Sequence, residues 1–357
     1  MSKRIEYIDV AKGIGIFLVV LGHNQVKNSL PALADFIYTF HMPMFFLLSG
    51  IFFRADMGFF ALLRRRFHTL LQPYLVTILA MYLTAFFFSQ TSLDIILRHL
   101  AKAAYASGTY LDWAPLWFLP ALFAVNIFVY LFFKAVYGRL PALWMRALVL
   151  AGMLWAGVET LNFFAEYRIH WFGREWVLNG LPFSLDLLLV IGVFFLIGYE
   201  IHRALPETFY ASWWTLGVSA LVLIALNLAF PFKIDLFFRV YQSFAVNSLE
   251  ALAGSLFVLC LSKQIADRGG WLSRTWQYLG RVSLILLIFH GPAQTYSSYK
   301  LDDWITNPYL MGLVSFILGL GVPILIYEWL IRPNPRVAAW FGVERLSATN
   351  KGGDQTL

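Results

Sequence analysis

Residues 7–24 read YIDVAKGIGIFLVVLGHN, an apolar stretch with Lys12 near its start and His23 near its end. The stretch predicts a membrane helix, in which an ionisable side chain is costly and is by default a hypothesis about function. The two residues are eleven positions apart, so their side chains share one helix face, about 16 Å apart along the axis. That face is expected to line the interior of a helix bundle. The structural alternative is that Lys12 extends to the membrane interface and His23 is a buried structural histidine.

The composition of the whole chain favours a membrane protein. Of its 357 residues, 60% are hydrophobic and only 13% are charged, whereas a soluble globular protein carries roughly 25% charged residues. Runs long enough to cross a bilayer, which takes about 20 apolar residues, lie at 10–26, 35–53, 69–89, 116–136, 144–164, 183–202, 212–230, 244–262, 281–299 and 309–330. Because these runs are continuous rather than alternating, they predict helices. The expected fold class is therefore an all-α polytopic membrane protein with about ten transmembrane helices.

The basic residues predict the orientation of these helices. With a cytoplasmic N-terminus, 19 of the 27 Lys and Arg residues fall on the cytoplasmic side, as the positive-inside rule requires. An even number of helices then puts both termini in the cytoplasm. The net charge of +7 follows from this topology, so nucleic acid is not expected as a partner. Residues 1–346 are expected to form one transmembrane domain and 347–357 a disordered cytoplasmic tail.

Two further histidines are predicted to lie near the depth of His23. His41 stands in FHMPMFFLLSG at the start of the second predicted helix. Because the first helix runs outward and the second returns, His41 and His23 should lie at similar depth. His290 stands in RVSLILLIFHGPAQ, before Gly291 and Pro292, which disturb helix regularity. Such histidines suit a general base or a hydrogen-bond partner, and the alternative is a structural or interfacial role.

The acidic residues and the single cysteine limit which kinds of catalytic or metal site the bundle can contain. Glu250 in NSLEALAGS and Asp186 in PFSLDLL are the acids expected inside the bundle, where either would orient a histidine or stabilise its charged form. Asp186 equally fits the membrane interface, three residues into its helix. Cys260 is alone, which excludes an internal disulfide and a Cys-rich metal site. No metal is expected at the histidines, because no carboxylate or cysteine shares their local spacing.

Three consecutive arginines follow the second predicted helix on the cytoplasmic side. Arg64, Arg65 and Arg66 open the stretch RRRFHTLLQPY. Guanidinium groups bind phosphate through paired hydrogen bonds, so this cluster suits a phosphorylated ligand. The alternative is a cluster that only sets the membrane topology.

Aromatic and polar residues are mixed in two of the loops expected on the outer side. These loops contain YASGTYLDWAPLWF (105–118), with Trp117, and AEYRIHWFGREW (165–176), with Trp171. Aromatic rings stack on sugar faces and polar groups bind hydroxyls, so the mixture suits carbohydrate. The alternative is an aromatic belt at the membrane interface.

Five stretches, in order along the chain, resemble blocks of the integral-membrane acyltransferase-3 family. They are IDVAKGIGIFLVVLGH (8–23), HMPMFFLLSG (41–50), RRRFHTLLQPY (64–74), PLWFLPALF (115–123) and GRVSLILLIFHGP (280–292). The matching residues are Asp9, Lys12, His23, His41, Pro43, Ser49, Gly50, Arg66, Pro73, Trp117 and His290. Many members have Arg in place of Lys12, and some carry an added esterase-like domain. Without such a domain, the chain resembles the stand-alone branch, which O-acetylates sugars of surface polysaccharides.

The resemblance implies transfer of an acetyl or other acyl group from cytoplasmic acetyl-CoA, the co-substrate, to a glycan hydroxyl. The acceptor would be a surface glycan or its lipid-linked precursor, and the setting the lipid bilayer of a bacterial inner membrane. Arg64, Arg65, Arg66 and Lys12 would bind CoA, and His23 would act as base or acyl carrier. His41, His290 and Glu250 would orient His23 or stabilise the oxyanion. Trp117, Asp186 and Trp171 would bind the acceptor from the outer side.

An exporter of glycan or acyl intermediates, without transferase chemistry, is the alternative from another functional class. It predicts the same spans, buried charges and interrupted helices. It does not predict a Lys and a His on one helix face together with an arginine cluster at the same mouth. It also predicts repeated halves, and the sequence contains none.

Overall fold

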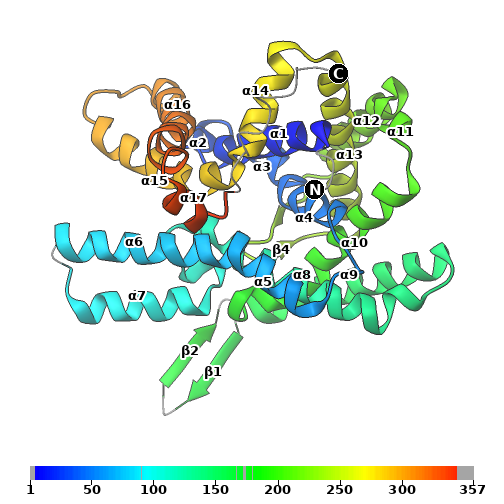
Figure 1. Ribbon diagram of the computed structural model, residues 1–357, viewed down its shortest axis with the longest axis horizontal. Coiled ribbons are helices and arrows are strands. Elements are labelled where there is room, and N and C mark those ends of the chain that lie inside the picture. Colours follow the sequence, from blue (N-terminus) through cyan, green and yellow to red (C-terminus); the bar gives the residue numbers. More distant parts are fainter. Residues whose placement is uncertain (1–4, 90, 166, 172–173, 179, 344–357) are drawn as a thin grey trace, which may run out of the picture.

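The computed structural model describes residues 5–343 except 90, 166, 172–173 and 179, and it consists almost entirely of helices (Figure 1). The first half contains α1 (Glu6–Gly22), α2 (Val26–Ser29), α3 (Pro31–Tyr38), α4 (His41–Ile51), α5 (Phe59–Arg66), η1 (Phe67–Leu71), α6 (Gln72–Phe88), α7 (Leu93–Tyr105), η2 (Gly108–Tyr110), η3 (Ala114–Trp117), α8 (Phe118–Ala135), η4 (Tyr137–Arg139) and α9 (Leu143–Ala165).

The second half contains β1 (Tyr167–Trp171), β2 (Arg174–Leu178), η5 (Pro182–Leu187), α10 (Leu188–Ala204), α11 (Glu207–Ala211), α12 (Trp213–Ala229), β3 (Ile234–Asp235), β4 (Val240–Tyr241), α13 (Phe244–Arg268), α14 (Gly270–Arg281), α15 (Ser283–Leu301), α16 (Pro308–Ile326), η6 (Tyr327–Ile331) and α17 (Pro335–Trp340). The elements η1 and η6 are single π-helical turns, and the other η elements are 3₁₀ turns.

Helices occupy all ten predicted ranges, which confirms the helical class for the described residues. Six helical stretches in that part of the chain are long and apolar enough to cross a membrane: Pro31–Ile51, Phe59–Phe88, Ala114–Arg139, Pro182–Ala204, Phe244–Arg268 and Pro308–Ile331. The helix Trp213–Ala229 is apolar but shorter. The count of ten spans and the cytoplasmic side of both termini stay predictions. The predicted domain boundary at 346 and the tail 347–357 lie outside the described residues.

Two short hairpins interrupt the helical pattern, and both lie in connecting segments. Strand β1 pairs antiparallel with β2, with Tyr167 opposite Leu178, and this hairpin projects from the body of the molecule (Figure 1). Strand β3 pairs with β4, with Ile234 opposite Tyr241. In β1 apolar and polar residues alternate, the period of a strand. The sequence analysis considered only the long apolar runs, so it did not predict either hairpin.

Helix α1, which carries Lys12 and His23, lies among other helices near the middle of the molecule (Figure 1). It contacts α4, α13, α14 and α15. Its crossing with α14 is close: a Cβ atom on Gly13 would overlap the Trp276 carbonyl oxygen, and one on Gly280 would overlap the Asp9 carbonyl oxygen. Small residues let helix backbones approach in a membrane, where association depends on van der Waals contact and hydrogen bonds. The glycines therefore set the position of α1.

A second pair of glycines brings α4 against α10. A Cβ atom on Gly50 would overlap the Phe195 carbonyl oxygen, and one on Gly198 would overlap the Leu47 carbonyl oxygen. Both neighbours are backbone atoms, which cannot move away without a shift of the whole helix. The contact fixes α4 and with it His41, its first residue.

We predict that Gly198→Ala destabilises the protein by about 1–3 kcal/mol, the range for overpacking a well-packed contact. Gly217→Ala on α12 is the matched control, because nothing lies within 4 Å of a Cβ there. The measurement is the thermal unfolding midpoint of both variants in one detergent. Equal midpoints for Gly198→Ala and the control would contradict the close α4–α10 contact.

Candidate active site

Three histidines from three helices meet in one cluster with Tyr38. The rings of His23 and His290 have centroids 5.4 Å apart at an interplanar angle of 77°. The Tyr38 ring lies 4.7 Å from the His41 ring and 6.1 Å from the His23 ring. His41 and His290 are fully enclosed, with relative exposures of 1% and 0%. The sequence analysis expected these histidines at one depth, and the structure brings them together. Their catalytic roles stay predictions.

The hydrogen bonds of the cluster determine the tautomer of each ring. In all three histidines Nδ1 bonds to the backbone carbonyl four residues earlier: His23 to Val19 at 2.9 Å, His41 to Ile37 at 2.9 Å and His290 to Leu286 at 2.8 Å. A carbonyl oxygen only accepts, so each Nδ1 carries the proton and each neutral ring keeps its lone pair on Nε2. The Nε2 atom of His290 is buried and has no hydrogen-bond partner in the described chain. The cluster thus concentrates basic nitrogen atoms away from solvent.

Buried polar side chains connect α1 to its neighbours on both sides of His23. The Gln294 amide on α15 donates to the Val20 carbonyl at 2.9 Å. The Asn24 amide donates to the Ser315 hydroxyl on α16 at 2.8 Å. Each unpaired amide in such an interior would cost free energy, so these bonds fix the end of α1. Sequence reasoning missed both residues and also Tyr38. A polar residue within an apolar helix was the available signal.

Glu250 is buried on α13 but does not touch the histidines. Its Oε2 atom accepts a hydrogen bond from the Asn247 amide at 3.1 Å, and its Oε1 atom is buried without a partner among the described residues. Gly254, one turn further along the same face, packs against the ring of Phe40, the residue before His41. Glu250 therefore lies about one helical turn from Gly254, and the contact of Gly254 with Phe40 is next to His41 in the chain. Its predicted role as an orienting acid stays a prediction.

Lys12 lies at the opposite end of the α1–α4 pair from the histidines. Its Nζ atom is 4.7 Å from the centroid of the Phe52 ring, within the range of a cation–π contact. Phe52 directly follows α4, whereas His41 begins it. The two helices are thus antiparallel. Lys12 lies near the end of α4, and His23 lies toward its start.

The three arginines end α5, immediately before the π-helical turn η1. Arg64 and Arg65 are exposed and Arg66 is partly buried. The Nε atom of Arg66 is buried and has no hydrogen-bond partner in the described part of the chain. A guanidinium N–H without an acceptor costs free energy that an anionic ligand would recover. π-Helical turns of this kind occur frequently at functional sites.

Of the aromatic residues predicted to bind the acceptor, Trp117 lies close to the cluster. It ends η3, which packs on α15 where Pro115 comes within 3.8 Å of a Cβ built on Gly291, the residue after His290. Trp117 is only 4% exposed, and its ring lies 6.5 Å from that of Phe237. Trp171 belongs to β1, and its side chain lies outside the described part of the structure.

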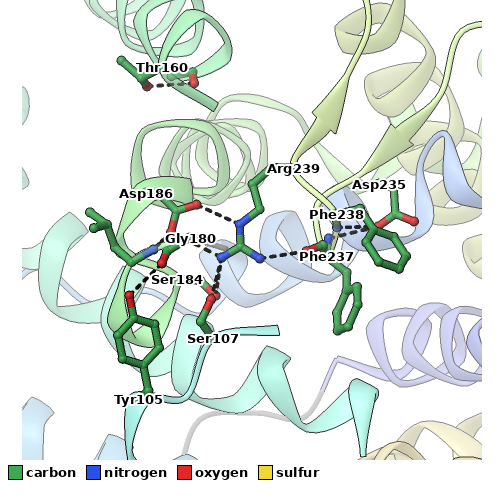
Figure 2. Close-up of polar contacts among 12 residues, drawn as sticks. Tyr105, Ser107, Thr160, Gly180, Ser184, Asp186, Asp235, Phe237, Phe238 and Arg239 are labelled. Atoms are coloured by element: carbon green, nitrogen blue, oxygen red, sulfur yellow. Dashed lines mark hydrogen bonds and ion pairs between the residues drawn. The ribbon is translucent and has the colours of Figure 1, made fainter. Parts of the chain in front are cut away.

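Asp186, also predicted to bind the acceptor, forms a buried ion pair with Arg239 (Figure 2). Arg239 Nε lies 2.9 Å from Asp186 Oδ2 and Nη2 lies 3.3 Å from Oδ1, which also accepts from the Leu181 N–H at 2.8 Å. Nη2 donates to the Ser107 hydroxyl at 2.9 Å. Both carboxylate oxygens thus have partners within the chain, so Asp186 holds structure together here. Sequence reasoning treated Arg239 only as one outer-loop charge.

Comparison with known proteins agrees with the resemblance of the sequence blocks. No curated protein and no solved structure matches the chain significantly. The family model Acyl_transf_3, described as an acyltransferase domain, matches residues 5–328. That range contains Lys12, the three histidines of the cluster and the arginines of α5. With nearly its whole length matched, this chain belongs to the acyltransferase-3 family, and it is a membrane acyltransferase.

Proposed function

We propose that the protein moves an acetyl or other acyl group from cytoplasmic acyl-CoA to a hydroxyl of a surface glycan or its lipid-linked precursor. The setting is a bacterial inner membrane. The observation that carries the proposal is the buried histidine cluster at one end of the α1–α4 pair, with Lys12 at the other end. A base and a cation separated along one helix suit a donor that enters from one side and an acceptor that enters from the other.

In this proposal the donor binds through the side chains of Arg64, Arg65, Arg66 and Lys12. Of these, Arg66 offers the strongest support, because its buried Nε–H has no acceptor within the described residues. A phosphate oxygen of CoA would satisfy that donor through a charge-assisted hydrogen bond. The pantetheine arm then follows α1, and about three turns of helix separate Lys12 from His23. The thioester thus reaches the histidine end of the helix.

His23 is the residue to which we assign proton transfer. The acceptor hydroxyl gives its proton to Nε2 as its oxygen attacks the thioester carbonyl carbon. A C–O bond forms, the C–S bond breaks, and CoA leaves as a thiolate that takes the proton from the imidazolium. The same Nε2 lone pair would serve direct attack on the thioester, which gives an acyl-histidine instead. Burial of the cluster limits competing hydrolysis by water.

The tautomers of His41 and His290 indicate which neighbouring side chains can accept a hydrogen bond and which can donate one. Nδ1 of His41 and of His290 already donates to a backbone carbonyl, so a neutral ring has no N–H left for an oxyanion. These two histidines therefore act as acceptors or as proton carriers. The Tyr38 hydroxyl is a donor in the same cluster, and it suits the developing negative charge on the thioester oxygen.

We expect His23→Gln to lower acyl transfer by about 10²–10⁴-fold, the typical contribution of a general base. Glutamine keeps a polar side chain of similar length but supplies no basic nitrogen. The measurement is transfer of labelled acetyl from acetyl-CoA in membranes, with the unfolding midpoint as the folding control. Transfer at the wild-type rate would overturn the role of His23. Glycan movement without CoA release would instead indicate an exporter.

Arg66→Gln should raise the KM for acetyl-CoA by about 10-fold or more, because a hydrogen bond to a charged group contributes about 1.5–3 kcal/mol. Arg139→Gln is the matched control: it removes the same charge from an exposed position at the end of η4, outside the proposed donor site, and should change KM by less than about threefold, as expected for an exposed charge. Both values come from initial rates at varied acetyl-CoA. Equal KM values for the two variants would argue against a phosphate at Arg66.

A further inference from the structure

The segment between α12 and α13, residues 230–243, contacts α3, the helix that carries Tyr38 of the histidine cluster. We call it the 230–243 hairpin, after its strands β3 and β4. It is tied to α3 by an exposed ion pair, with Lys233 Nζ 2.8 Å from Asp35 Oδ2. It meets η3 through the rings of Phe237 and Trp117. It is held to η5 by the Arg239–Asp186 pair. The hairpin thus touches α3, which carries Tyr38, and η3, which packs on α15, and it is anchored on η5.

The Arg239 anchor is specific and strained. Arg239 has a φ of +59°, a left-handed conformation that a residue with a side chain adopts at a cost. Its guanidinium packs where Gly180, at φ +83°, has no side chain, and a Cβ there would overlap it. Its Nη1 atom donates to the Phe237 carbonyl at 2.7 Å (Figure 2). The surrounding hydrogen bonds offset this strain, so they determine where the tip of the hairpin lies.

Asp235 at that tip has one carboxylate oxygen available for a ligand. Oδ1 accepts from the Phe237 N–H at 3.0 Å and from the Phe238 N–H at 3.1 Å, while Oδ2 has no hydrogen bond in the described chain (Figure 2). Lys233, two residues before Asp235, pairs with Asp35, three residues before Tyr38, whose ring contacts His41. Burial raises the pKa of Asp235, and the charges of Lys27 and Arg239 oppose that rise. The tip therefore presents a half-buried acceptor on the hairpin that pairs with α3, the helix that carries Tyr38.

The same hairpin contains a hollow of about 620 Å³. Ligand pockets for small molecules range over about 300–1,000 Å³. Its lining includes the side chains of Phe232, Phe238, Tyr241 and Gln242. Aromatic faces and an amide suit the faces and hydroxyls of a sugar ring, and Phe238 is 60% exposed. The hairpin that carries Asp235 thus also offers an aromatic-lined hollow with room for a sugar.

We propose that the 230–243 hairpin is the acceptor-side wall of the histidine cluster, and that Asp235 accepts a hydrogen bond from a second hydroxyl of the sugar being acylated. The ligand class is a polyhydroxylated ring, since a single hydroxyl group cannot serve both Asp235 and His23. The proposal rests on the acyl transfer proposed above. It adds which residues select and orient the acceptor.

The test compares Asp235→Asn with the wild-type protein. An asparagine carbonyl oxygen still accepts from the Phe237 and Phe238 N–H groups, so the turn is kept and only the charge is lost. Asp303→Asn, at an exposed position after α15, makes the same charge change as a control. The acceptor probe is the polysaccharide and glycolipid fraction extracted from cells that lack this protein, supplied at varied concentration with labelled acetyl-CoA.

Asp235→Asn should raise the apparent KM for this probe by about 10-fold or more, as expected for a lost hydrogen bond to a charged group. The KM for acetyl-CoA should stay at the wild-type value, a split that general misfolding would not produce. An unchanged KM for the probe would overturn the role of Asp235. No transfer to the probe by the wild-type protein would instead overturn the proposed function itself.

A second experiment tests the position of the hairpin without touching Asp235. Lys233→Asp breaks the exposed pair with Asp35 and should raise the KM for the same probe severalfold, while the unfolding midpoint changes little because exposed pairs contribute about 0–1 kcal/mol. The exchanged pair Lys233→Asp with Asp35→Lys should restore it. The proposal that the hairpin forms the acceptor wall would be contradicted by a wild-type KM in Lys233→Asp. A double exchange that does not restore the KM would contradict it as well.

Discussion

The close crossing of α1 with α14 at Gly13 and Gly280 is the contact on which the rest of the arrangement depends. It places α1 among other helices, so that Asp9 is buried and Lys12 and His23 are partly buried by protein. Gln294 and Asn24 then hold the far end of α1 by interhelical hydrogen bonds. Since His23 ends this helix, backbone contacts made about two turns or more away set where this histidine, the proposed base, stands.

The chemistry of the cluster follows from hydrogen bonds inside each helix. Each histidine donates its Nδ1 proton to a carbonyl one turn earlier, and this local bond leaves the basic lone pair on Nε2. The backbone carbonyl of the helix thereby orients each imidazole, as a carboxylate does in many hydrolases. Because neutral rings held this way cannot donate from Nε2, we assigned the developing negative charge to the hydroxyl of Tyr38, whose ring lies in the same cluster. Local helix geometry thus divides the roles among neighbouring side chains.

Sequence reasoning predicted the helices and the histidines well, and the long-range pairs poorly. The antiparallel order of the first two predicted helices was enough to predict that His23 and His41 lie at similar depth. It was not enough to show that Asp186 pairs with Arg239, because those residues are 53 positions apart and the pair depends on how η5 and the 230–243 hairpin meet. The hairpin was missed because its strands are two residues each and carry little periodic pattern.

The sequence by itself determined the helical membrane class, the positions of the apolar helices and the shared face of Lys12 and His23. These are local properties, because hydropathy and helical period act over a few turns. Only the tertiary structure decided that three histidines and Tyr38 meet, that Asp186 pairs with Arg239 and that the 230–243 hairpin is tied to α3. Such contacts join residues far apart in the chain, and their geometry depends on backbone approach at a few glycines, which no local pattern encodes.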